Sequence, residues 1–168
     1  EMCIKRQNYG GCNYNNNNAK MNITSSQFTQ NQAQNGGVNA NYGSLTIKSS
    51  NQNNNKATRG GVNYNFRNLQ IIKSTFKNNK VTTNAAVTYN DKGTVTINDS
   101  TFESNIANGN GGVNYNNNGN MIITLCKNNK NIAIRGGVNY DYGTMTITNS
   151  TFTQNKACLL YTSPSPRD

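Results

Sequence analysis

The feature that most constrains this chain is an internal repeat that runs through almost its whole length. A Gly-Gly-apolar triplet begins at positions 10, 36, 60, 111 and 136, and Ala85-Ala86-Val87 fills the one gap in the series. The intervals between successive copies are 26, 24, 25, 26 and 25 residues. Six copies in step at this period are typical of a solenoid, in which each repeat forms one unit stacked on the next.

Three apolar columns keep the same step as the triplet, and we predict that they form the core. The third position of the triplet supplies Val38, Val62, Val87, Val113 and Val138. A second column is invariant, with Ile23, Ile47, Ile71, Ile97, Ile123 and Ile147. Five residues further on, four copies carry phenylalanine and two carry an amide instead: Phe28, Gln52, Phe76, Phe102, Asn128 and Phe152.

Asparagine is the most unusual part of the composition, with 37 residues in 168. Six of these occupy the same place in every repeat: Asn31, Asn55, Asn79, Asn105, Asn131 and Asn155. We predict that this column forms an internal ladder, in which each side-chain amide bonds those above and below it and the turn backbone. The alternative is six exposed turn residues.

Within each copy the apolar residues alternate with polar ones, and no stretch shows a sustained helical period. The sequence therefore predicts an all-β fold of about six coils, each with about three short strands joined by turns. Equivalent strands would pair in parallel, about 4.8 Å apart, to give a rod roughly 30 Å long. The glycine pair would mark a bend that needs positive φ or a close backbone approach.

The chain divides into two parts at its C-terminal end. Residues 1–157 are expected to be a solenoid fragment, truncated at both ends and continued there by further coils of the same protein. Residues 158–168 hold both prolines and no asparagine, and they are typical of translated sequencing-adapter read-through. The alternative for this tail is a genuine linker rich in proline and serine.

The paired motifs, Gly-Gly-apolar and Phe-x-x-Asn, resemble the repeats of chlamydial polymorphic outer-membrane proteins and of similar bacterial and protist surface proteins. The resemblance covers residues 10–157, and it departs from the family pattern where Gln52 and Asn128 replace phenylalanine. It implies a right-handed parallel β-helix of the pectate-lyase-like type. It also implies an extracellular or cell-surface location and a role in structural display or adhesion.

The absence of histidine excludes a histidine-based triad, a histidine-ligated metal and an imidazole proton relay. Glycoside hydrolysis needs two carboxyl groups that face each other across a cleft. The acids before the tail are Glu1, Asp91, Asp99, Glu103 and Asp141. Asp91 and Asp141 fall in similar turns two coils apart, whereas Asp99 and Glu103 lie within one coil. We therefore expect no enzyme, no metal and no cofactor.

The alternative function is a fragment of a polysaccharide lyase or glycoside hydrolase of pectate-lyase-like fold. Such an enzyme would use Asp99 and Glu103 or residues outside this chain. A lyase would use Arg59 or Arg135, which each precede a glycine pair but lie three coils apart. A third alternative is an ice-binding solenoid with a Thr-x-Thr face. It is disfavoured because the equivalent columns also hold Asn22, Gln70 and Ile122.

The formal net charge of +10 favours anionic partners. The basic residues form no continuous stripe and no nucleic-acid-binding motif, so we expect no specific nucleic-acid partner. Glycans or anionic cell-surface components remain the candidate partners. No run of 18 or more apolar residues is present, so the sequence contains no transmembrane segment.

Three cysteines precede the tail, and they do not determine the redox compartment. Cys12 occupies the valine position of the first triplet, where cysteine behaves as a small hydrophobe, and Cys126 occupies a serine position in a turn. These two lie more than four coils apart and cannot form a disulfide. A pairing of Cys3 with Cys12 stays open.

Overall fold

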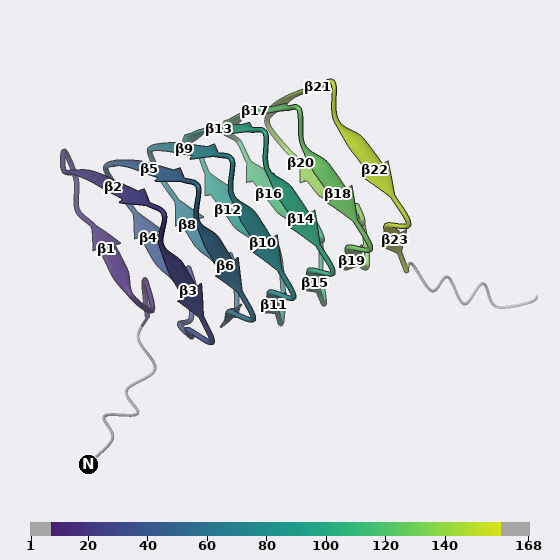
Figure 1. Cartoon of the computed structure of the whole chain (residues 1–168). Coiled ribbons are helices and arrows are strands. Elements are labelled where there is room, and N and C mark those ends of the chain that lie inside the picture. The colour runs from purple at the N-terminus through teal and green to yellow at the C-terminus, as the bar shows by residue number, and fades with distance from the viewer. Residues whose placement is uncertain (1–7, 159–168) are drawn as a thin grey trace, which may run out of the picture.

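The computed structural model describes residues 8–158 and consists, over that range, of strands joined by turns, with no helix. The chain winds into a parallel β-solenoid of six coils (Figure 1). It rises through one sheet at the back, crosses a second along the top and descends a third at the front while it advances along the axis. This path is right-handed, as expected, and a fourth, short sheet of five strands closes the second to sixth coils below.

The first and second sheets each contain one strand from every coil. The first sheet consists of β1 (Asn13–Asn15), β4 (Asn39–Asn41), β8 (Asn63–Asn65), β12 (Thr88–Asp91), β16 (Asn114–Asn117) and β20 (Asn139–Asp141). The second sheet has the longest strands, which are β2 (Lys20–Thr24), β5 (Ser44–Lys48), β9 (Asn68–Ile72), β13 (Thr94–Asn98), β17 (Asn120–Thr124) and β21 (Thr144–Thr148).

The third and fourth sheets complete the coil. The third sheet consists of β3 (Gln27–Thr29), β6 (Asn51–Asn53), β10 (Thr75–Lys77), β14 (Thr101–Glu103), β18 (Lys127–Asn129) and β22 (Thr151–Thr153). The fourth sheet consists of two-residue strands, β7 (Lys56–Ala57), β11 (Lys80–Val81), β15 (Ile106–Ala107), β19 (Ile132–Ala133) and β23 (Lys156–Ala157). The sequence predicted about three strands per coil, because a two-residue strand is too short to show an alternating pattern.

The register follows the repeat, so that equivalent residues stack directly on one another. Ile71, for example, pairs with Ile47 on one side and with Ile97 on the other. Every pairing between the strands is parallel, and each backbone ladder is continued by the next coil. A single coil could not bury its apolar side chains alone, and stacking gives all coils one continuous core.

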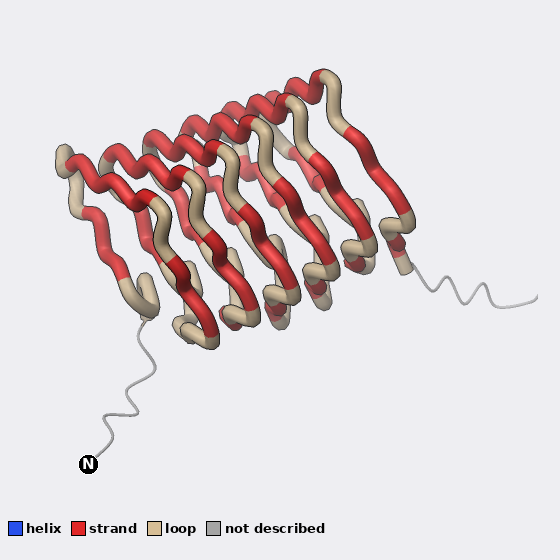
Figure 2. The backbone as a smooth tube through the Cα atoms, viewed as in Figure 1, coloured by secondary structure: helices blue, strands red, loops and turns tan. Residues whose placement is uncertain are grey.

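Each coil bends at three equivalent places where one residue takes positive φ, and three coils add a fourth such residue, at Asn18, Lys92 and Asn118. These bends lie in the tan turns between the red strands of Figure 2. One bend uses the first glycine of the pair, with φ of 60° at Gly10 and 70° at Gly111, and Ala85 takes the same conformation with φ of 60°. The second glycine of the pair does not have positive φ. The glycine pair therefore forms a bend in which only the first residue has a left-handed backbone conformation, and in one coil that residue is Ala85.

The predicted apolar columns line the interior of the central coils. Val62, Val87, Ile71, Phe76 and Phe102 are fully buried there. A smaller cluster under the fourth sheet contains Ala57, Val81, Ala86, Ala107 and Ala133.

Burial is lost at the two ends of the described solenoid. Ile147 and Phe152, predicted as core residues, are 42% and 45% exposed, because no described coil packs on the outer side of the last coil. Phe28 is half-buried for the matching reason in the first coil. Cys12 is exposed although it holds the inward valine position. The side chains at these positions point into the solenoid, but burial also requires a neighbouring coil on each side.

Candidate functional surface

The predicted asparagine column lies inside the solenoid as a continuous side-chain ladder. Asn79 donates from Nδ2 to Oδ1 of Asn105 at 3.0 Å, and its backbone N–H donates to the same oxygen at 3.0 Å. Nδ2 of Asn79 also donates to the carbonyl of Gln52 at 2.8 Å. The same side-chain bond links every pair of neighbours from Asn31 to Asn155 at 3.0–3.1 Å. The ladder thereby satisfies buried polar groups that would each destabilise the fold if unpaired.

Two further polar columns run under the first sheet and were missed by the sequence analysis. The longer one joins Asn15, Asn41, Asn65, Asn90, Asn116 and Asp141 by side-chain bonds of 2.6–2.8 Å. The other contains Asn39 and Asn63 but is interrupted at Thr88, and Oδ1 of Asn114 is buried beside this break without a hydrogen-bond partner. The sequence signal for these two columns was the Asn-x-Asn that follows Gly-Gly-Val in several repeats.

The structure does not gather the described acidic residues into one cleft. Asp91 accepts hydrogen bonds from Asn117 Nδ2 at 3.0 Å and from the Tyr64 hydroxyl at 3.4 Å. Asp141 ends the longer asparagine column and lies one column away from Asp91.

The two acids of the alternative enzyme hypothesis lie in different kinds of position. Glu103 lies on the third sheet and forms an ion pair with Lys77 at 3.0 Å. Asp99 is exposed in the preceding bend, where its φ is 49°. Among residues 8–158, no group of three or more cysteine or acidic side chains is placed to hold a metal ion. Glu1 and Cys3 lie outside the described residues.

Tyrosine is the residue type that the fold does gather. Tyr64, Tyr89, Tyr115 and Tyr140 stack in successive coils with ring centroids 5.0, 4.9 and 5.5 Å apart and planes within 12° of parallel. We call these four residues the aromatic column. Strand alternation places it on the outer face of the first sheet, because the neighbouring asparagines of β8 point inward.

Other aromatic residues extend this column towards both ends. Ala40 interrupts it, and Tyr42 fills the gap by stacking between Tyr14 and Phe66, at 5.3 and 4.5 Å. At the other end, the hydroxyls of Tyr140 and Tyr142 lie 3.1 Å apart. With Tyr9, which contacts Tyr42 and Tyr64 edge-on, all eight tyrosines of the described range lie on this one face. The signal in the sequence was the tyrosine that follows Gly-Gly-Val-Asn.

The tyrosine hydroxyls of this surface have altered acidity. Burial raises the pKa of Tyr64 to about 12, with Asp91 and Tyr89 adding to the effect and Arg59 opposing it. Burial also raises the pKa of Tyr89, and Asp91 again adds to it. Tyr64 and Tyr89 are therefore neutral at physiological pH, with Arg59 beside them. Arg135 lies beside Tyr140 in the same way, so the two arginines that a lyase would use both accompany the aromatic column.

A cavity of about 360 Å³ opens beside the aromatic column, at the turn between the first and second sheets. Its lining combines aromatic, amide and charged side chains of both signs: Tyr14, Asn16, Asn17, Tyr42, Phe66, Arg67, Asp91 and Lys92. Such a lining offers flat apolar contact and hydrogen-bonding groups to a polar ligand.

The two cysteines that the structure describes before the tail have different surroundings. Cys126 is buried, and its Sγ donates to the carbonyl of Thr124 at 3.2 Å. Burial raises the pKa of the Cys126 thiol. The serines at the equivalent position bond in the same way, as Ser74 does to Ile72 at 2.8 Å. Cys126 thus takes the place of a buried serine, and it does not lie near Cys12.

No family model matches this chain, and neither the curated proteins nor the solved structures include one that matches it. The described residues also contain no helix of the length and apolar character needed to cross a membrane.

Proposed function

We propose that this solenoid is a non-catalytic segment that serves structural display and adhesion on a cell surface or in a secreted protein. The repeats that resemble polymorphic outer-membrane proteins of the pectate-lyase-like class support this role. The observation that carries the proposal is the tyrosine-rich outer face of the first sheet. Tyrosine is enriched at binding interfaces because its ring gives large contact area and its hydroxyl gives a polar contact at little entropic cost.

Within that face Tyr64, Tyr89 and Tyr115 are only 5–8% exposed, so a partner would contact mainly the exposed tyrosines towards its two ends, Tyr9, Tyr14 and Tyr142. The rings of the face are locked by stacking, so little conformational entropy is lost when a partner binds. The adjoining cavity, with Arg67, Asp91 and Lys92, adds hydrogen-bonding groups of the kind that a glycan requires. A catalytic site needs converging polar groups, whereas Asp99 and Glu103 lie in a bend and in an ion pair.

The first experiment measures adhesion of the immobilised chain to cells and to a glycan panel. Tyr14 and Tyr142 are 53% and 58% exposed and extend the tyrosine-rich face at its two ends. Substituting both by serine should weaken binding at least tenfold, since losing two exposed aromatic contacts at about 1 kcal/mol each removes about 2 kcal/mol of binding free energy. Leu125→Ser is the matched control, because Leu125 is 52% exposed and lies in the bend between the second and third sheets. Equal losses in the control and the tyrosine variant would contradict the proposal.

The second experiment addresses the alternative enzyme. The chain is incubated with pectic and other acidic polysaccharides, and the release of unsaturated or reducing sugars is measured. The proposal expects no release. Turnover that disappears in Asp99→Asn or Glu103→Gln would replace the proposal with a carbohydrate-active enzyme.

An ice-binding role is not favoured. The strands β13 and β21 carry Thr-x-Thr, but β17 lies between them and places Asn120 and Ile122 in the same columns. A regular threonine lattice is therefore interrupted on this face. Measurement of thermal hysteresis should give none.

A further inference from the structure

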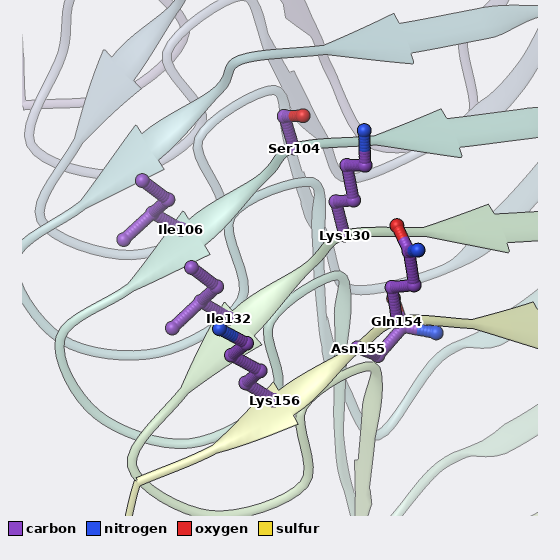
Figure 3. Close-up of a pocket in the computed structure, with 7 residues that line it drawn as sticks. All are labelled: Ser104, Ile106, Lys130, Ile132, Gln154, Asn155 and Lys156. Carbon is purple, nitrogen blue, oxygen red and sulfur yellow. The ribbon is translucent and has the colours of Figure 1, made fainter.

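The outer side of the fourth sheet carries a groove that the proposed function does not use. The groove has a volume of about 620 Å³, and Figure 3 shows the residues that line it: Ser104, Ile106, Lys130, Ile132, Gln154, Asn155 and Lys156. Ile106 and Ile132 come from β15 and β19, which are neighbours in the sheet. Their side chains lie next to each other, with Lys156 beside Ile132, whereas Lys130 lies further along the groove near Ser104 (Figure 3).

This groove is cationic as well as apolar. Lys130 and Lys156 are exposed, and the ion pair of the described residues, between Lys77 and Glu103, involves neither of them. None of the acids within residues 8–158 lines the groove. Lys56 and Lys80 precede Ile106 in the same outward column, so positive charge continues along the axis. The surface therefore attracts anions and, at its centre, exposes apolar side chains to water.

The hydrogen-bonding capacity of the groove limits the kind of partner that fits it. The backbone N–H groups of Ile106, Ile132 and Lys156 already donate to carbonyls of neighbouring coils at 2.8–2.9 Å. Asn155 is engaged by the asparagine ladder. A polypeptide strand therefore has no free ladder to join, and a saccharide finds only Ser104 and Gln154. An anionic group attached to hydrocarbon needs neither a backbone ladder nor many polar side chains, because the lysines pair with its charge and the isoleucines contact its hydrocarbon.

We propose that the fourth sheet docks on an anionic phospholipid bilayer. Ile106, Ile132 and the neighbouring Ile134, which is 43% exposed, enter the boundary between head groups and acyl chains. Lys130 and Lys156 contact the lipid phosphates on either side of the isoleucines' point of entry. The proposal goes beyond the adhesive role of the first sheet and does not rest on it, since the two surfaces belong to different sides of the coil (Figure 1).

The test measures sedimentation of the full chain with vesicles of phosphatidylserine and phosphatidylcholine, and with vesicles of phosphatidylcholine alone. Binding is expected to the first and not to the second. Each lysine near an anionic surface strengthens binding about fivefold, so Lys130→Gln with Lys156→Gln should weaken it about 25-fold. The matched control is Lys20→Gln with Lys48→Gln, which removes the same charge from the second sheet on the opposite side of the coil.

A second pair of variants separates a membrane from a general polyanion. Ile106→Ser with Ile132→Ser keeps the charge and should reduce vesicle binding severalfold, while far-UV circular dichroism shows that the fold is intact. Binding to heparin, a soluble polyanion, should not change with these substitutions. The proposal is overturned if the control lysines matter as much as Lys130 and Lys156. It is also overturned if the serine variants bind vesicles as the original chain does, because the partner is then any polyanion.

Discussion

Gln52 offers the sharpest test of how the interior of this solenoid is stabilised. It occupies the phenylalanine column, in register with Phe28 on one side and Phe76 on the other. The side chain is fully buried, and neither Oε1 nor Nε2 has a hydrogen-bond partner. We expect the substitution Gln52→Phe to stabilise the protein.

The expected gain follows from three terms. Removing two unpaired buried polar atoms recovers about 1–3 kcal/mol for each. A new ring between Phe28 and Phe76 would stack as Phe76 and Phe102 do at 5.1 Å, which adds about 1 kcal/mol. The larger ring introduces an overpacking cost of about 1–3 kcal/mol. The net result is a free energy of unfolding higher by about 3 kcal/mol.

The assay is urea denaturation followed by far-UV circular dichroism, for the original chain, Gln52→Phe and Gln52→Met. Methionine has nearly the volume of glutamine, so it removes the polar atoms without stacking or overpacking. It should also raise the free energy of unfolding, by about 4 kcal/mol, and the urea midpoint should rise with it. A lower midpoint for Gln52→Met would refute the reasoning, because the glutamine amide would then be making stabilising contacts.

Three further predictions concern the ladder, the bend and the tyrosines. Asn105→Ala should lower the free energy of unfolding in urea by about 3–5 kcal/mol, because it leaves hydrogen-bonding groups of Phe76 and Asn79 without a partner. The control Asn108→Ala, at an exposed position, should change it by no more than about 0.5 kcal/mol. Equal effects of the two substitutions would argue against the ladder. Gly111→Ala should cost at least about 1–2 kcal/mol, since φ there is 70° and an added Cβ would meet the Asn114 carbonyl; an unchanged midpoint would show that the bend relaxes freely. The pKa of Tyr64 is about 12 in the folded chain and near 10 when unfolded, so the folded state keeps this proton longer and its stabilising effect is lost as the pH rises from 10 to 12. The thermal unfolding midpoint should therefore fall more steeply between about pH 10 and 12 in the original chain than in Tyr64→Phe. Parallel dependence of the two midpoints on pH would contradict the raised pKa of Tyr64.

Much of the fold could be predicted because the repeat ties each residue to a column. The isoleucine, valine and phenylalanine columns alternate with polar residues, and this pattern alone indicates parallel stacking of coils. Gln52 and Asn128 were visible as departures from the phenylalanine column. Their burial without full hydrogen bonding required the structure, because only the packing shows which polar atoms lack partners.

The parts that were missed depend on packing between coils. The fourth sheet has strands such as Lys80–Val81, which are too short to show any period. Ile147 and Phe152 have the right spacing for the core, but burial also requires a neighbouring coil. The aromatic column was readable as a tyrosine after Gly-Gly-Val-Asn. Its significance appears only when stacking brings Tyr64, Tyr89 and Tyr115 together.

The most direct test of the account is a set of distances along the solenoid axis, measured by pulsed electron paramagnetic resonance. Cys3, Cys12, Cys126 and Cys158 are first replaced by serine, and spin labels are then placed on exposed second-sheet positions in one column. Labels at Thr24 and Thr148 are five coils apart and should be separated by roughly 24 Å, and labels at Lys48 and Thr148, four coils apart, by roughly 19 Å. Distances that grow by about 4.8 Å per coil would support the stacked solenoid. Broad distributions, or distances that do not follow the number of intervening coils, would contradict it.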